Sequence, residues 1–232
     1  MTTTIKIMRV SYPDIRVPQW QGRRLRGFFS ASQETGSLLH NHGGDGPVYR
    51  YPLVQYKVLG GIPTVLAAEE GIPAVYPLVM ERETLALGEQ TYERGELRFD
   101  LRKESVGDCP EERKYRFVSP WFALNQENYR IWQSSSPEEQ TELLERILTG
   151  NILSFAKGFG LTAENRLRVT ASLKSNRSRF KDGQIVSFRG GFTVNYALPD
   201  LFGLGKSVSR GFGALRRVYE SGKNRESKEG SA

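Results

Sequence analysis

Hydrophobic positions in the first hundred residues alternate between strand-like and helix-like spacing. Residues Thr3 to Tyr12 alternate with a period of two and predict a strand that ends at Pro13. Pro18 suits the first position of a helix that runs to about Ser32. The further predictions are a hairpin formed by Val48 to Leu59 and Thr64 to Ala67, a helix from Pro73 to Leu87, and a strand pair from Gln90 to Arg102 that turns at Gly95. This order of strand, helix, two strands, helix and strand is the ferredoxin-like pattern.

The same pattern begins again after the polar segment Lys103 to Lys114, which we interpret as a linker. A strand opens at Tyr115, and Ser136-Pro137-Glu138-Glu139 predicts a helix start with a capping serine and proline at the first helical position. We expect the apolar stripe of this helix to face the core, and it comprises Leu143, Leu144, Ile147, Leu148, Ile152 and Phe155. Gly158 and Gly160 are expected to end the helix.

A hairpin between Arg166 and Arg189 and a strand from Val186 to Ala197 complete the second half. We therefore predict an α+β protein with two tandem ferredoxin-like (RRM-like) domains, each with an antiparallel sheet. The N-terminal domain would span residues 1–106 and the C-terminal domain residues 115–219.

Charge adds a first indication of the partner. Lysine and arginine number 33 against 26 acidic residues, for a formal net charge of +7. Such an excess favours a polyanion, which could be RNA, DNA or an anionic membrane surface. We expect no membrane span and a cytoplasmic protein, because no apolar run approaches the roughly 20 residues that a span needs and no leader opens the chain. Cys109 is the only cysteine, which excludes an intrachain disulfide and a Cys-rich zinc site.

Cations concentrate in the second half of the chain. The segment from Arg166 to Arg189 carries seven of them against the single carboxylate Asp182, with the hairpin tip expected at Ser175 to Gly183. A basic hairpin can enter a nucleic-acid groove or contact an RNA stem, and the alternative is a solvated charged loop. The arginines of the first predicted helix leave the same choice between a solvated face and a nucleic-acid groove; these are Arg23, Arg24 and Arg26.

A glycine-rich stretch follows, from Leu201 to Val218. It has four glycines and four cations, and no carboxylate lies between Leu201 and Tyr219. Glycine backbones can aim their amides at an anion, and the cations would add charge for a phosphate backbone. The alternative is an ordinary glycine-rich hairpin. The spacing does not fit a dinucleotide fingerprint or a Walker loop, so we exclude nucleotide hydrolysis and redox chemistry.

Both histidines, His40 and His42, lie in the polar loop His40-Asn41-His42-Gly43-Gly44-Asp45-Gly46-Pro47. Three interpretations are open for them: a metal site completed by Asp45, a plain exposed loop, and general acid/base chemistry, to which imidazole is suited near neutral pH. Tyr49 begins the following strand on the same face as Lys57. Tyr49 is therefore a candidate hydrogen-bond donor to the same site, or a half-buried strand residue.

With these segments together, the sequence resembles the CRISPR-associated endoribonucleases that cut repeat RNA, members of the RAMP superfamily. The likeness rests on the Gly203-Leu-Gly-Lys-Ser-Val-Ser-Arg-Gly-Phe-Gly213 segment, which is similar to the family's G-rich loop. It rests also on the histidine loop followed by Tyr49-Arg-Tyr-Pro-Leu-Val-Gln-Tyr-Lys57, and on the two ferredoxin-like halves.

The resemblance implies cleavage of CRISPR repeat RNA by the adjacent ribose 2′-OH, with no metal and no cofactor. The products would be a 2′,3′-cyclic phosphate and a 5′-OH. His42 and His40 would do the general acid/base work, Tyr49 would orient or donate, and Lys57 would stabilise charge in the transition state. The RNA-binding residues implied are Gly203, Gly205, Lys206, Arg210, Gly211 and Gly213, with Lys174, Arg177 and Arg179 gripping a repeat stem or its flank.

Two other functions stay open. A non-catalytic RAMP subunit would hold guide RNA in a CRISPR effector complex, because the G-rich loop serves both classes. A general RNA-binding protein would show no preference for CRISPR repeats. The partner expected in the first two cases is CRISPR repeat RNA, with effector-complex subunits and a homodimer left open.

Overall fold

The computed structural model describes residues 2–31, 51–180 and 183–219. His40, His42 and Tyr49 therefore lie outside the described residues. Within the described part of the chain, no helix is long and apolar enough to cross a membrane.

The first half has the ferredoxin-like order of elements. They are β1 (Thr2–Ser11), the 3₁₀ turn η1 (Gln19–Gln21), α1 (Gly22–Ser30), β2 (Val54–Leu59), β3 (Ile62–Ala68), α2 (Gly71–Met80) and β6 (Arg98–Phe117). The strands pair antiparallel in the order β2-β3-β1-β6. The predicted first strand and the predicted hairpin are present, but the first strand of the hairpin begins at Val54, and Tyr51 to Leu53 before it are not in a strand. The hairpin turns at Gly60 and Gly61, both with positive φ, so Ile62 and Pro63 belong to the strand and not to the turn.

One predicted helix of this half is too long, and the two strands of one predicted pair do not pair with each other. The helix expected to reach Leu87 ends at Met80, and β4 (Thr84–Leu87) follows it. Along β4, Leu85 and Leu87 are buried at alternate positions, a period of two that the helix interpretation passed over. β5 (Gln90–Glu93) pairs with β4 in a separate two-stranded sheet, and not with β6. After Gly95, the Glu96 amide donates to the Asp14 carboxylate at 2.9 Å. This hydrogen bond ties the chain between β5 and β6 to the segment that follows β1.

The second half has the same strand order as the first, but among its described residues no helix corresponds to α2. Its elements are the far end of β6, α3 (Gln126–Ser134), α4 (Pro137–Gly158), β7 (Val169–Phe180), β8 (Gly183–Ala197), the 3₁₀ turn η2 (Val208–Arg210) and β9 (Leu215–Val218). The strand order β9-β6-β8-β7 matches that of the first half, and all pairs are antiparallel. Where the first half has its second helix, this half has the glycine-rich stretch with η2. The α+β class with two ferredoxin-like halves is thus confirmed.

The start of α4 is as predicted. Ser136 and Glu139 form a capping box, with proline in the first turn. The helix ends at Gly158, and its predicted core positions are buried except for the partly buried Ile147. β7 and β8 pair as far as Phe180 and Gly183, so the hairpin tip is shorter than the expected Ser175 to Gly183.

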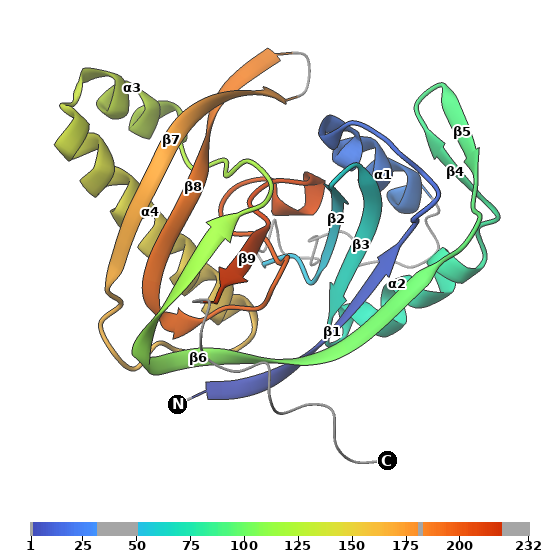
Figure 1. The fold of residues 1–232 in the computed structure, drawn as a ribbon, viewed down its shortest axis with the longest axis horizontal. Coiled ribbons are helices and arrows are strands. Elements are labelled where there is room, and N and C mark those ends of the chain that lie inside the picture. Colours follow the sequence, from blue (N-terminus) through green and yellow to red (C-terminus); the bar gives the residue numbers. More distant parts are fainter. Residues whose placement is uncertain (1, 32–50, 181–182, 220–232) are drawn as a thin grey trace, which may run out of the picture.

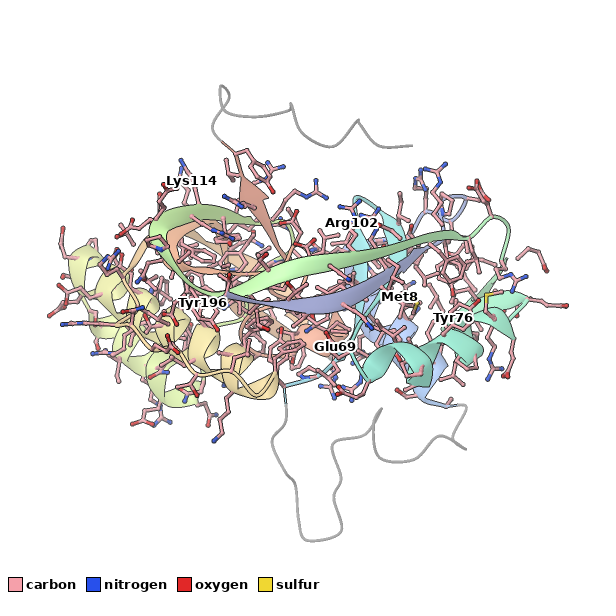
Figure 2. The ribbon with its side chains drawn as sticks, turned by 90° about the horizontal axis from the view of Figure 1, so that it is seen from below. Met8, Glu69, Tyr76, Arg102, Lys114 and Tyr196 are labelled. Atoms are coloured by element: carbon pink, nitrogen blue, oxygen red, sulfur yellow. The ribbon has the colours of Figure 1, made fainter. Side chains whose placement is uncertain are left out.

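The segment Lys103 to Lys114 is not a linker but the middle of β6. This strand pairs with β1 at its first end and with β8 and β9 at its second, with a shift of register between Asp108 and Arg113. The polar residues of the segment gave the appearance of a loop, yet Asp108 is buried and accepts the amides of Glu164 and Asn165 at 2.9 and 3.3 Å. Figure 1 shows β6 crossing both halves, and Figure 2 shows it unbroken between Arg102 and Lys114.

The sheet of the first half is buried on both faces. Met8 and Val10 of β1 belong to a core that includes Leu25 of α1 and Val75 of α2. Ile5 and Ile7, on the opposite face, belong to the aromatic core of the second half. The two halves therefore share one core and one strand, and the glycine-rich stretch lies between them (Figure 1).

Candidate nucleic-acid interface

The Gly-rich loop, residues Leu201–Ala214, connects β8 to β9 and folds back on itself. Gly203 and Ala214 form an antiparallel bridge, and the Leu204 amide donates to the Gly213 carbonyl at 3.0 Å. The loop is also tied to the chain before α3, since the Lys206 amide donates to the Phe122 carbonyl at 2.9 Å. These hydrogen bonds within the second half fix part of its backbone path.

Glycine is required in this loop for close packing. Gly205 has φ +90°, and a Cβ there would lie 2.5 Å from the indole nitrogen of Trp121. Gly213 has φ +68°, and a Cβ there would meet the Leu204 carbonyl oxygen. L-residues avoid this region of φ, and neither neighbouring atom is a flexible side-chain end.

The amides of the loop glycines are mostly used inside the protein. The Gly203 amide donates to the Gln55 side-chain oxygen at 2.9 Å, and the Gly213 amide to the Pro120 carbonyl at 2.8 Å. The Gly211 amide is directed at the Val208 carbonyl at 3.4 Å. The sequence suggested that such amides would cradle a phosphate. In this structure those three already have acceptors, so the cations of the loop are its means of attracting an anion.

Residues of β2 and of the chain just before it form hydrogen bonds with the backbone of the Gly-rich loop. Lys57 is fully buried, and its Nζ donates to the carbonyls of Val208 and Phe212 at 2.8 and 2.7 Å. The Tyr51 hydroxyl donates to the Gly203 carbonyl and accepts from the Gln55 amide at 2.8 Å. Lys57, for which the sequence suggested stabilisation of the transition state, thus has its ammonium directed at the inner side of the loop. Burial lowers the pKa of Lys57 well below its usual value.

Replacing this lysine by an isosteric apolar residue tests its supporting role. We expect Lys57→Met to lower the free energy of unfolding by about 3 kcal/mol, because two buried carbonyls lose their donor. The pKa of Lys57 is lowered in the folded state. Between the folded and the unfolded pKa of this group, the unfolded chain binds more protons than the folded one, so the stability of the wild type rises with pH. Chemical denaturation at pH 7 and pH 9 should therefore show a larger difference between wild type and Lys57→Met at pH 9.

The exposed Lys103 on β6 offers the same change as a control. We expect Lys103→Met to stay within about 0.5 kcal/mol of wild type at both pH values. A Lys57→Met protein as stable as Lys103→Met, or a difference that does not grow with pH, would contradict the supporting role.

A cationic pocket of about 330 Å³ opens beside the loop, and we call it the arginine pocket. Three segments form most of its lining: η1 with the start of α1, the last residues of β7 with Arg189 of the neighbouring β8, and residues Arg210 to Phe212 of the Gly-rich loop; Pro120 completes it. Figure 1 shows these parts of the chain on one side of the molecule. Among the described residues that line it, six are arginines and none is acidic; the arginines are Arg23, Arg24, Arg177, Arg179, Arg189 and Arg210.

Contacts between the three segments hold the pocket walls. Arg189 of β8 donates to the Gln19 side chain at 3.0 Å. Gly22 of α1 packs so closely on the loop that a Cβ there would lie 3.2 Å from the Arg210 carbonyl oxygen. Burial, and to a lesser extent the charge of Arg210, lowers the pKa of Arg26 on the same helix.

Aromatic rings stand among these cations. The guanidinium carbons of Arg24 and Arg179 lie 4.9 and 5.5 Å from the centroid of the Trp20 ring. Phe180 and Phe212 also line the pocket, and their ring centroids are 5.8 Å apart. The pocket therefore offers both charge and flat stacking surfaces, the combination that single-stranded nucleic acids bind.

The structure brings together some of the residues expected to bind RNA and separates others. Arg177, Arg179, Arg210 and Gly211 line the arginine pocket. The other loop positions, Gly203, Gly205, Lys206 and Gly213, do not, although Lys206 is exposed and has its Nζ 5.9 Å from the Phe122 ring. Lys174 is exposed on β7 and lines a different depression, together with Lys114 and Phe192.

Several pocket residues were not singled out by the sequence. Trp20 is an apolar residue within the segment predicted as the first helix, and it is 41 % exposed. An aromatic next to Arg23 and Arg24 was the available signal, since cations interleaved with aromatics are typical of RNA surfaces. Phe180 and Phe212 had no comparable signal.

The two histidines and Tyr49 are not among the described residues, but both flanks of their segment are. Upstream is α1, whose first residue Gly22 packs on the Gly-rich loop; downstream is Tyr51, hydrogen-bonded to Gly203. The segment from 32 to 50 leaves α1 at the end opposite Gly22 and rejoins the described chain just before Tyr51, which contacts this loop. Among the described residues, no group of three or more His, Cys, Asp and Glu side chains could hold a metal ion.

Comparison with known proteins matches both halves of the chain. The family model described as the Cas6b N-terminal domain matches residues 3–105, and the Cas6b C-terminal domain matches residues 109–218. The two ranges meet within β6.

Similar proteins extend this match. An uncharacterized protein of Methanocaldococcus jannaschii is 38% identical over 118 residues, which are 50% of this chain and 80% of that protein. A solved structure described as Cas6b is 33% identical, with a TM-score of 0.88, over 93% of this chain and 100% of that one. A second, described as CRISPR RNA processing endoribonuclease Cas6b, is 30% identical with a TM-score of 0.77 over the same shares. Matches to both family models, together spanning nearly the whole described fold, show that this chain belongs to the Cas6b family.

Proposed function

We propose that this protein is an endoribonuclease that cleaves precursor CRISPR RNA within its repeats. The observation that carries the proposal is the likeness, over 93% of the chain, to a structure described as CRISPR RNA processing endoribonuclease Cas6b. The arginine pocket supports it, because six arginines with no acidic residue among the described lining suit an RNA backbone.

The chemistry we propose is an internal attack. The ribose 2′-OH loses its proton to a general base and forms a bond from its oxygen to the adjacent phosphorus. The bond between phosphorus and the 5′-oxygen breaks, and a general acid protonates that leaving oxygen. The products are a 2′,3′-cyclic phosphate and a 5′-OH, and no metal takes part.

His42 and His40 are the proposed base and acid, and Tyr49 a donor to the phosphate. Support comes from the downstream flank of their segment, where the Tyr51 hydroxyl donates to the Gly203 carbonyl of the Gly-rich loop. Arg177, Arg179 and Arg210 are proposed to hold the RNA backbone. Lys57 is assigned a positioning role beneath the loop, on account of its burial and its two carbonyl acceptors.

The experiment that tests this function incubates the purified protein with labelled repeat RNA of its host in EDTA. A matched RNA carries a single 2′-deoxy sugar at the cut site. We expect cleavage of the first RNA and none of the second, since the deoxy sugar lacks the nucleophile. Cleavage of both would contradict attack by the 2′-OH, and loss of cleavage in EDTA would contradict metal independence. Binding of both RNAs without cleavage would favour a non-catalytic RNA-holding subunit.

A further inference from the structure

We propose that the arginine pocket receives one unstacked nucleotide from a single-stranded part of the RNA, with its base against Trp20 and its phosphate among the arginines. The inference rests on the proposed function, because it takes the substrate to be RNA. It goes beyond that function because it assigns the arginine pocket to an unstacked nucleotide of single-stranded RNA.

The base-binding side of the pocket is built around Trp20. This side chain is 41 % exposed although it lines a concave site, so its ring is accessible from the pocket. Arg24 and Arg179 lie over the ring and come from opposite halves of the protein. Guanidinium groups and indole rings are both surfaces on which bases stack, and stacking tolerates any of the four bases.

The phosphate-binding side consists of cations without carboxylate partners. Among the described residues, none of the six pocket arginines forms a salt bridge; the salt bridges of that part of the chain involve other arginines. Arg24 and Arg189 are held in place by uncharged oxygens, the Leu87 carbonyl at 3.4 Å and the Gln19 side chain at 3.0 Å. Their charge is therefore not neutralised by these contacts. A guanidinium can bind a phosphate through two parallel hydrogen bonds.

Shape favours a single strand over a duplex. An A-form duplex presents phosphates on a convex surface and keeps its bases stacked inside, out of reach of a recessed ring. The aromatic wall of this pocket, Trp20 with Phe180 and Phe212, would then face only sugar and phosphate. A nucleotide turned out of its stack brings a flat base to this wall and leaves its phosphate at the rim. A volume of about 330 Å³ is near the lower end of small-ligand pockets and suits one such unit.

A coupling measurement tests the proposal without any need for catalysis. The probe is the repeat RNA made uncleavable by a 2′-deoxy sugar at the cut site, in a series in which one position at a time is abasic. Dissociation constants are measured for wild type and Trp20→Ala. We expect Trp20→Ala to weaken binding of the intact RNA by about 10- to 100-fold, in line with the loss of one base stack. At one position, removal of the base should weaken RNA binding by wild type by a similar factor. Removal of the same base should not weaken RNA binding by Trp20→Ala any further.

Two controls accompany the series. Tyr76 on α2 is an exposed aromatic outside the pocket, labelled in Figure 2, and Tyr76→Ala should leave the dissociation constant within about 2-fold. The same RNA annealed to its complement should bind wild type and Trp20→Ala alike. Arg177→Gln provides a second variant in case Trp20→Ala does not fold, since Arg177 is exposed. It should reduce the slope of log affinity against log salt by about 0.7 for single-stranded RNA.

The outcomes separate this inference from the proposed function. Coupling at one position supports the nucleotide pocket, whether or not the protein cleaves RNA. If no abasic position couples to Trp20, or if Tyr76→Ala weakens binding as much as Trp20→Ala, the inference is overturned, even for an enzyme that cleaves. Equal weakening of duplex and single-stranded RNA by Trp20→Ala would also overturn it.

Discussion

The double variant His40→Ala/His42→Ala is expected to cleave repeat RNA at least about 10⁴-fold more slowly than wild type, because general base and general acid each contribute about 10²- to 10⁴-fold. Binding should change by no more than about 3-fold, since neither role concerns the positively charged pocket that we propose attracts the RNA backbone. Single-turnover rates with enzyme in excess, beside dissociation constants for the uncleavable RNA, measure the two quantities separately.

Asn41, between the two histidines, provides the matched control. Asn41→Ala alters the same segment without removing an imidazole, and it should cleave within about 5-fold of wild type. The single variants show which histidine dominates. Normal cleavage by the double variant would remove the histidines from the mechanism.

The substitution with the largest expected effect on stability is Gly213→Ala. Its Cβ would meet the Leu204 carbonyl oxygen, and φ is +68° at this position. Strain and overlap with backbone together should lower the free energy of unfolding by about 4 kcal/mol. Because the same position ties the Gly-rich loop to Pro120, the fraction that stays folded should also bind RNA less tightly. Denaturant unfolding followed by circular dichroism measures the first effect.

Gly150→Ala is the same chemical change, but it should have the opposite effect on the free energy of unfolding. Gly150 lies inside α4, and a Cβ there would have no atom within 4 Å. Gly150→Ala should raise the free energy of unfolding by about 0.5–1 kcal/mol, because alanine loses less conformational entropy in a helix. Equal effects of the two substitutions would contradict the packing role of Gly213.

Much of the fold could be predicted where the signal is local. The capping box at Ser136 and the hairpin turn at Gly60-Gly61 depend on residues a few positions apart, and both are found. The order of elements in the first half followed from such signals, and it led to the ferredoxin-like topology. Basic segments near Arg177 and Arg210 were likewise visible as charge, and both reach the arginine pocket.

The errors arose where a distant partner decides the local structure. Lys103 to Lys114 has the composition of a linker, but β1, β8 and β9 supply hydrogen bonds along it and bury Asp108. Lys57 lies on a strand near the histidine loop, which suggested chemistry. Its burial depends on the Gly-rich loop, more than a hundred residues later.

The sequence by itself determined the ferredoxin-like order of the main elements, the excess of positive charge, the glycine-rich stretch and the likeness to a family. Each of these depends on neighbouring residues or on composition. Only the tertiary structure decided that one strand joins both halves, that loop glycines serve packing, and that Trp20, Arg179 and Arg210 line one pocket. These arrangements come from contacts between residues far apart in the chain, which are set by the packing of the two halves and which no local pattern encodes.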